Sequence, residues 1–186
     1  MNTRRSFLLA TALLAAAGAA PRMLASPMSA NGARVVSTWD FGVGANQAAW
    51  KVLAAGGSAL DAVEAGARWA ESDLCNPTVG RCGNPDRDGV LTLDASIMAG
   101  DGRCGSVAAL SDILHPVSVA RRVMEQTPHV MLVGEGAQQF AVQQGFERRR
   151  LLTEDADRAW REWLRAEHYA PQVNAALRGL PGCVPR

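Results

Sequence analysis

The chain has 186 residues, 48% of them hydrophobic, and its formal net charge is +1. A nearly neutral protein lacks the electrostatic field that draws proteins to nucleic acid or acidic lipid, so neither is an expected partner. Once the N-terminal leader described below is set aside, the remaining length is that of one domain of common size.

The first 30 residues predict an export signal. Arg4 and Arg5 precede an apolar, alanine-rich run that reaches Ala20. This run falls short of the ~20 residues of a membrane span, and small residues follow it, as in a cleavable signal. The paired arginines match the twin-arginine address, which a receptor reads and which is not an anchor. We therefore expect periplasmic or other export without a membrane anchor, with cleavage after Ala20 or one of two later alanines.

The first half of the chain predicts a strand and two helices. Residues 34–39 are apolar and β-branched, which is typical of a strand. Residues 45–57 carry apolar side chains at helical spacing and end in a glycine pair, as helices often do. A second helix is expected over 58–73, where Ser58 and Asp61 form a variant of the capping box.

A loop rich in Gly, Pro, Asn and Asp follows over 74–89, and these residues favour turns. Residues 90–98 alternate apolar and polar side chains, which predicts a strand with one buried face. Residues 106–110 can return antiparallel as its hairpin partner. The remaining elements are expected as a helix over 115–127, a short buried strand over 129–134, and helices over 136–145 and 153–167.

An antiparallel hairpin flanked by helices predicts the α+β class rather than a doubly wound parallel sheet. The helices are amphipathic, so we expect them to pack on the faces of the sheet. Thr153 is placed to cap the last helix, whose first turn holds acidic residues that favour the helix dipole.

The cysteines are Cys75, Cys82, Cys104 and Cys183. Their spacing does not fit a zinc site. In an oxidising compartment a disulfide is the better interpretation, and Cys75 and Cys82, which flank one loop, form the most plausible pair. Free, buried thiols are the alternative.

Motifs for catalysis, metals or cofactors are weak. None of the three histidines lies in a G-x-S-x-G elbow or an H-E-x-x-H helix. Asp86, Asp88 and Asp94 resemble a calcium loop, but the glutamate that closes such a loop is missing. Gly134 and Gly136 lack the third glycine of a dinucleotide-binding turn. The sequence therefore predicts no metal and no cofactor.

Four blocks, in order along the chain, carry a resemblance to a known family. They read STWDFGVGANQAAWKVLAAGGSALDAVEAG, TVGRCGNPDRDGVLTLDASIM, HPVSVARRVMEQTPHVMLVGEGAQQFAVQQGF and LLTEDADRAWREW. The region from about Arg34 to Asn174 resembles the α subunit of the glycosylasparaginases. Blocks this long, in one order, are far more specific than a short motif.

The resemblance implies an N-terminal nucleophile hydrolase with a four-layer αββα sandwich. Such enzymes cut their own precursor before a threonine, which then begins the β subunit and attacks the amide joining N-acetylglucosamine to asparagine. Related enzymes hydrolyse L-asparagine or isoaspartyl peptides. Trp39 lies at the end of the first expected strand, where an aromatic residue is more often core than ligand contact. The resemblance implies instead that Trp39 lines the substrate pocket.

The family's His-Asp-Thr-like junction has no counterpart in this sequence, and the last threonine, Thr153, is the expected helix cap. We therefore expect residues 31–174 to form an α-subunit-like domain, followed by a divergent tail over 175–186. This arrangement favours a truncated or frame-shifted precursor, or else a processed α chain. The β half of the sandwich would be missing, and the chain would contain no catalytic residue of its own.

The expected partners are a β subunit with an N-terminal threonine and a small amide substrate, glycoasparagine or asparagine. Without that subunit we expect the chain to be inactive. The alternative hypothesis is a non-catalytic exported remnant or interaction protein, because half a sandwich exposes apolar faces and strand edges that bind partners.

Overall fold

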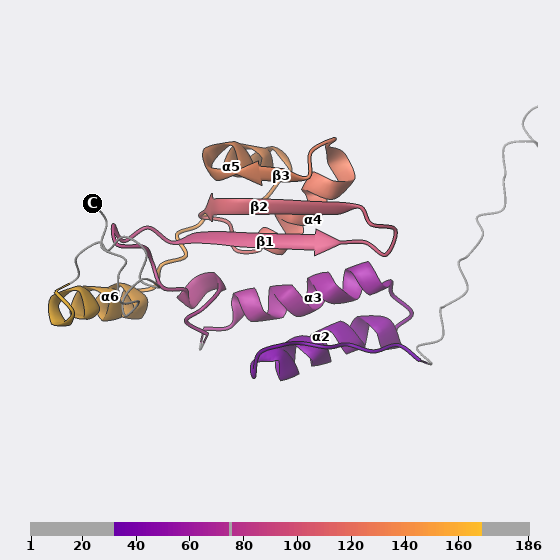
Figure 1. Cartoon of the computed structure of the whole chain (residues 1–186), viewed down its shortest axis with the longest axis horizontal. Helices are drawn as coiled ribbons and strands as arrows, with labels where there is room; N and C mark the ends of the chain where they lie inside the picture. Colours follow the sequence, from indigo (N-terminus) through magenta and orange to yellow (C-terminus); the bar gives the residue numbers. More distant parts are fainter. Residues whose placement is uncertain (1–31, 75, 169–186) are drawn as a thin grey trace, which may run out of the picture.

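The computed structural model describes residues 32–74 and 76–168. Within them the chain forms helices and a small sheet of the α+β class (Figure 1). In chain order the elements are α2 (Gly42–Ala54), α3 (Ala59–Ser72), the 3-10 turn η1 (Gly80–Cys82), β1 (Thr92–Met98), β2 (Cys104–Ser111), α4 (Pro116–Gln126), β3 (Met131–Val133), α5 (Gly134–Gln143) and α6 (Glu154–Ala166).

Helices α2 and α3 form a closely packed hairpin. The connection ends α2 with Gly56 at φ 83°, a left-handed conformation that glycine adopts without strain. Ser58 then caps α3, because its hydroxyl accepts from the Asp61 N–H while the Asp61 carboxylate accepts from the Ser58 N–H. The two helices approach closely because Gly44 leaves room for the Trp69 ring, which a Cβ there would meet at 2.2 Å.

The sheet has the strand order β1-β2-β3. β1 pairs antiparallel with β2, and β2 pairs parallel with β3. The β1–β2 register shifts between Leu93 and Ala95, where the Asp94 carboxylate accepts a 2.7 Å hydrogen bond from the Ala109 N–H. Ala109 has φ 50°, so this bulge holds a non-glycine residue in the left-handed region.

One face of the sheet carries the core. Helix α4 packs on β1 and β2, and α5 packs on β2. Their apolar side chains form one cluster with the inward residues of both long strands, namely Ile97, Val107, Leu110, Ile113, Val117, Val119, Ala120, Val123, Ala137 and Ala141. On the other face of β1 the side chains are exposed: Thr92, Asp94, Ser96 and Met98. Within the described residues, this second face has no covering layer.

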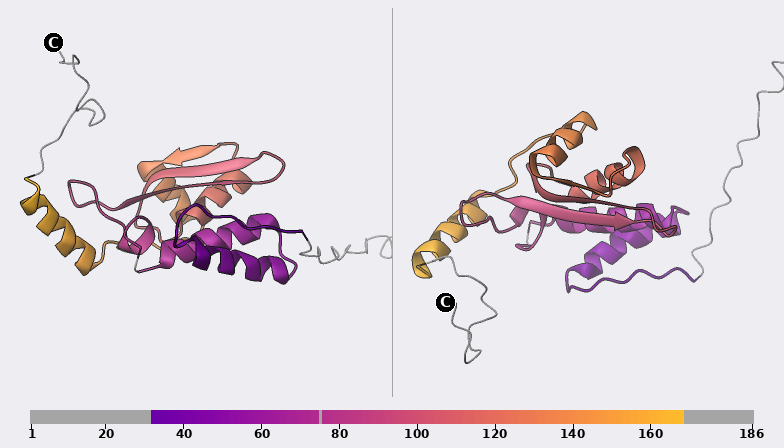
Figure 2. Two further views of the ribbon diagram at one scale, coloured as in Figure 1. Left: turned by 60° about the horizontal axis from the view of Figure 1, so that its bottom comes forward. Right: turned by 45° about the horizontal axis from the view of Figure 1, so that its top comes forward.

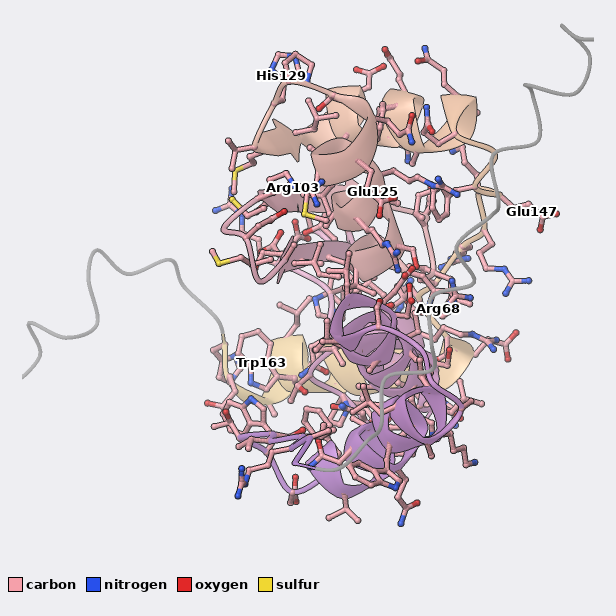
Figure 3. The ribbon with its side chains drawn as sticks, turned by 90° about the vertical axis from the view of Figure 1, so that its right-hand side faces the viewer. Arg68, Arg103, Glu125, His129, Glu147 and Trp163 are labelled. Atoms are coloured by element: carbon pink, nitrogen blue, oxygen red, sulfur yellow. The ribbon has the colours of Figure 1, made fainter. Side chains whose placement is uncertain are left out.

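Helix α3 runs beside β1, and α2 lies on the far side of α3 (Figure 1). α3 joins the rest of the fold through α4, where Arg121 bridges three carboxylates. Its guanidinium lies 2.7 Å from Asp61, Glu64 and Glu125. Figure 3 shows Arg68 and Glu125 in this α3–α4 region. The contact between these two helices thus combines ion pairs from Arg121 to Asp61 and Glu64 with apolar packing of Leu60 and Ala67 against the core cluster.

The hydrogen bonds and ion pairs around Arg121 shift the pKa values of Asp61 and Arg121. The pKa of Asp61 is lowered, first by the hydrogen bond from the Ser58 hydroxyl and then by the one from Arg121. Partial burial acts to lower the pKa of Arg121, but hydrogen bonds to Glu125, Asp61 and Glu64 outweigh burial and raise it. Arg121 therefore stays charged, and Asp61 keeps its charge to a lower pH than a solvated aspartate.

Helix α6 lies at the end of the sheet where β1 begins and β2 ends (Figures 1 and 2). Its N-cap is Thr153, whose hydroxyl accepts from the Ala156 N–H at 3.2 Å, as predicted. None of its residues is fully buried. Its anchor is Trp160, whose ring lies over Gly89, where a Cβ would meet it at 2.8 Å.

The structure confirms the predicted helices and the β1–β2 hairpin, with small shifts at their ends. The strand predicted over 34–39 is wrong: this segment is not in a strand, and Val36 is 88% exposed. An extended segment becomes a strand only when another strand pairs with it, and none in the described part of the chain does.

Two predictions about packing are also wrong. β3 is shorter than expected and is not buried, since Met131 and Val133 are more than half exposed at the edge of the sheet. The helices do not all pack on the sheet, because α2 lies against α3 rather than against a strand. An amphipathic pattern shows that a helix has one apolar face but does not identify the surface that covers it.

Candidate functional site around Trp39

Trp39 lies in the turn that leads into α2. Its carbonyl accepts a 2.9 Å hydrogen bond from the Gly42 N–H, and the neighbouring Asp40 carboxylate accepts one of 2.8 Å from the Phe41 N–H. The turn holds the indole outward, where it is 70% exposed. Trp39 is thus not part of the core that residues 32–74 and 76–168 form.

Two contacts hold the segment before Trp39 along α2. The Ser37 hydroxyl donates to the Asn46 side-chain oxygen one helical turn into α2. Gly42 allows this approach, because a Cβ at that position would meet the Ser37 Cβ at 2.3 Å. The position of Trp39 therefore depends on a small residue and a local hydrogen bond.

A pocket of about 480 Å³ opens beside Trp39. Because α2 and α3 are antiparallel, the chain returns at the end of α3 to the start of α2, and the loop after α3 forms the opposite wall. The lining residues are Trp39, Asp40, Phe41, Asp73, Asn76, Pro77 and Thr78. A second hollow of about 490 Å³ shares Phe41 and Thr78 and continues between β1 and the ends of α3 and α4 that face it.

The loop wall is shaped by a turn at Asn76. The Asn76 side-chain oxygen accepts from both the backbone N–H of Thr78, at 3.0 Å, and its hydroxyl, at 2.6 Å. Gly80 then takes φ 68° and passes so close to α3 that a Cβ would lie 1.9 Å from the Glu71 carbonyl oxygen. No other residue type fits at Gly80 without moving the loop.

Glu71 fixes the base of the same loop to α4. It is buried, and its carboxylate accepts a 3.0 Å hydrogen bond from the Val117 N–H, one of the unpaired donors at the start of α4. The other carboxylate oxygen lies 3.0 Å from the Nδ1 atom of His115. A buried carboxylate is stable when hydrogen bonds satisfy it, so this arrangement makes the loop wall rigid.

The pocket is acidic and suited to binding. Asp40 and Asp73 contribute carboxylates, and none of the lining residues is cationic. Among the lining residues, Thr78 carries a hydroxyl, the group that could act as a nucleophile. Its backbone nitrogen is an internal amide that cannot act as a base, and its hydroxyl donates a hydrogen bond to Asn76. The described residues of this pocket can hold a ligand but offer no activated nucleophile.

The sequence identified Trp39 and missed the residues around it. Asp73, Asn76 and Thr78 lie more than thirty positions away; Asp73 was expected to end the helix over 58–73, and the other two only to belong to a turn-forming loop. The two consecutive helices predicted over 45–57 and 58–73 were the available signal, because helices joined by a short connection pack antiparallel and bring the end of the second to the start of the first. That Trp39 contacts substrate stays a prediction.

Other expectations concern the cysteines and the membrane. Cys82 is half-buried and bonded to no other cysteine of the described ranges; Cys75 lies outside them, so the pairing of Cys75 with Cys82 stays a prediction. Over residues 32–74 and 76–168, no helix has the length and apolar character required to cross a bilayer. In the same ranges no three potential metal-ligating side chains come together.

Sequence comparison supplies the class of protein. The matched sequence is that of a glycosylasparaginase-like protein of the N-terminal nucleophile hydrolase type, and the α+β fold is consistent with part of such a hydrolase. The chain belongs to the asparaginase family, whose sequence model matches residues 10–181.

The similar curated proteins carry one name. The chain is 49% identical over 180 residues to the N(4)-(beta-N-acetylglucosaminyl)-L-asparaginase of Elizabethkingia miricola, covering 93% of this chain and 53% of that protein. It is 46% identical over 131 residues to the enzyme of that name from Rattus norvegicus, covering 70% of this chain and 38% of the rat protein. The chain thus spans about half the length of the curated relatives that it matches, or less.

Proposed function

We propose that this chain supplies the α-like part of an amidohydrolase that cleaves the amide between N-acetylglucosamine and asparagine. The observation that carries the proposal is the 49% identity to the Elizabethkingia enzyme, whose name states that bond. The pocket supports it, because an exposed tryptophan beside carboxylates and an amide suits a polar, ring-containing ligand. In this proposal Trp39 binds substrate and does not take part in proton transfer.

The nucleophile in this proposal is a threonine at the start of a β segment outside the printed sequence. A hydroxyl is a weak nucleophile at neutral pH, and the free α-amine of a terminal threonine can take its proton. Hydrogen-bond donors then stabilise the oxyanion of the tetrahedral intermediate. Residues 32–168 would position the substrate through Trp39 and provide the surface on which the β segment folds.

We also propose that the β segment completes a four-layer αββα sandwich. The second face of β1 supports this, because Thr92, Asp94, Ser96 and Met98 lie exposed there. The extended segment before Trp39 supports it as well: Val36 is exposed, and the segment would become a strand if the β segment paired with it. Both features describe an incomplete surface rather than a finished one.

The substrate is tested by mixing the chain with a separately produced segment that begins with threonine, taken from the remaining half of the Elizabethkingia relative. The mixture is assayed on N-acetylglucosaminyl-asparagine, L-asparagine and an isoaspartyl dipeptide. The proposal expects the first substrate to have the highest kcat/KM. A mixture that prefers L-asparagine or the dipeptide would contradict the assigned substrate.

We further propose export through the twin-arginine route. Arg4 and Arg5 support this, since they stand directly before the apolar run. A fusion of residues 1–31 to a reporter that is active only in the periplasm should be exported, and replacing both arginines by lysine should abolish export. Equal export of both fusions would exclude the twin-arginine address.

A further inference from the structure

Three consecutive arginines between α5 and α6 line a pocket that the proposed function does not use. This arginine pocket, lined by Arg148, Arg149 and Arg150, has a volume of about 750 Å³. Its other walls come from the turn before β1, the end of β2 and one side chain of α5. It shares no lining residue with the Trp39 pocket. The two pockets are therefore separate candidates for binding.

The backbone that carries the arginines is held at two points. The Arg149 N–H donates a 2.8 Å hydrogen bond to the Asp112 carbonyl oxygen, and the Arg148 Nη2 atom lies 3.1 Å from the Asp112 carboxylate. The next side chain after the arginines, Leu151, is 3% exposed and packs with Leu91 in a small core cluster. The backbone of the pocket is thus ordered before a ligand arrives, which reduces the entropic cost of binding.

The positive charge of the arginine pocket is only partly neutralised. Asp112 is the one carboxylate among its lining residues, and it pairs with Arg148. Over residues 32–74 and 76–168, neither Arg149 nor Arg150 forms an ion pair. Asp157 on α6 forms its ion pair within its own helix. Two guanidinium groups therefore remain for a ligand that carries about two negative charges.

The lining favours a phosphate group attached to a small polar molecule. Guanidinium groups bind phosphate through parallel, charge-assisted hydrogen bonds, and a phosphate monoester carries up to two negative charges at pH 7, whereas a carboxylate carries one. The volume is that of a site for a whole small molecule rather than a lone ion. Ser111 and Gln138 also line it. Their hydroxyl and side-chain carbonyl can bind the hydroxyls of such a molecule.

We propose that Arg149 and Arg150 bind the phosphate of a monoester of a small hydroxylated molecule, such as a sugar phosphate. The phosphate lies between the two guanidinium groups, and the hydroxyls of the ligand face Ser111 and Gln138. This site uses neither Trp39 nor any group of the proposed β segment. Its test and the test of the proposed function therefore have separate outcomes.

The test is isothermal titration calorimetry of the full chain with glucose 6-phosphate, and in parallel with inorganic phosphate and with glucose, at low ionic strength so that charges are little screened. Glucose 6-phosphate should bind with a Kd below about 1 mM, inorganic phosphate about tenfold more weakly, and glucose not measurably. Arg149→Gln and Arg150→Gln should each weaken the binding of glucose 6-phosphate about tenfold, because each removes charge-assisted hydrogen bonds.

Arg103→Gln is the matched control, because it removes the same charge from an exposed arginine outside the arginine pocket. Arg103 lies in the β1–β2 turn, at the far end of the hairpin from α6 (Figures 1 and 3). This variant should bind glucose 6-phosphate like the wild type. Asp112→Asn should bind it about threefold more tightly, because the change releases Arg148 from its ion pair. Asparagine tolerates the φ of 60° at this position.

Three results would overturn the proposal. One is that glucose 6-phosphate does not bind, or binds equally well to Arg149→Gln and Arg150→Gln. Another is that Arg103→Gln weakens binding as much as these variants do, which would indicate unspecific attraction. The third is that inorganic phosphate binds as tightly as the ester, which would remove the organic part of the ligand. If the glutamine variants do not fold, the gain expected for Asp112→Asn still decides, because misfolding does not tighten binding.

Discussion

Gly80 shows how one residue positions the pocket loop. It adopts φ 68°, and a Cβ would lie 1.9 Å from the Glu71 carbonyl oxygen. Gly80→Ala should therefore destabilise the chain by about 3 kcal/mol, from backbone strain together with the clash. Urea unfolding followed by circular dichroism measures this loss.

Two glycines of the β1–β2 turn serve as controls. Gly102 has φ 88° in open space, so Gly102→Ala isolates the backbone strain and should cost about 1 kcal/mol. Gly100 has open space without a positive φ, and Gly100→Ala should change stability by less than about 0.5 kcal/mol. If Gly80→Ala and Gly102→Ala lowered the free energy of unfolding equally, the close approach of Gly80 to Glu71 would have no energetic role.

A substitution of Trp39 tests whether this residue serves substrate binding or the stability of the fold. Because the side chain is 70% exposed, Trp39→Ala should leave the unfolding midpoint nearly unchanged. In the mixture with the threonine-led segment it should raise KM about tenfold and change kcat little, since a ring contact stabilises substrate and transition state alike. Trp50→Ala, on α2 outside the pocket, is the control and should leave KM and kcat unchanged. A large loss of stability in Trp39→Ala would mean a structural role.

At the scale of elements, the α3–α4 contact makes stability depend on pH. The pKa of Asp61 lies below its ordinary value of 3.8, so the folded state favours the charged carboxylate. Its contribution is therefore present above pH 3.8 and is lost as the pH falls through the lowered pKa of the folded state. Asp61→Asn should be less stable at neutral pH and should lose less stability on acidification.

Urea unfolding at neutral and acidic pH tests this dependence. Asp88→Asn, which removes an exposed carboxyl outside the network, should follow the wild type. If Asp61→Asn and the wild type lost stability in parallel on acidification, the Ser58 and Arg121 hydrogen bonds would not set the acid response.

Local patterns predicted the elements well. Alternation over 90–98 and the capping box at Ser58 are determined by neighbouring residues, and both were confirmed. The segment 34–39 has the composition of a strand but no partner in the described chain, and composition does not specify a partner. Only Trp39 of the candidate site was predicted, through a family resemblance, because the position of Asn76 on the opposite wall of the pocket depends on how α2 and α3 pack.

At the scale of the whole molecule, the chain has one covered sheet face and one exposed face. It spans 53% of its Elizabethkingia relative. The covered face shows that the described part has a core of its own, and the exposed face is the surface that the proposed β segment would bury. The proposed function therefore separates folding from activity: residues 32–168 would bind the substrate, and the threonine-led segment would react with it.

The most direct test of this account measures aspartate released from N-acetylglucosaminyl-asparagine by three samples: the chain alone, the threonine-led segment alone, and their mixture. The account predicts release only by the mixture, and a mixture whose leading threonine is replaced by alanine should be inactive. Release by the purified chain alone would contradict it, because the printed sequence would then contain a nucleophile of its own.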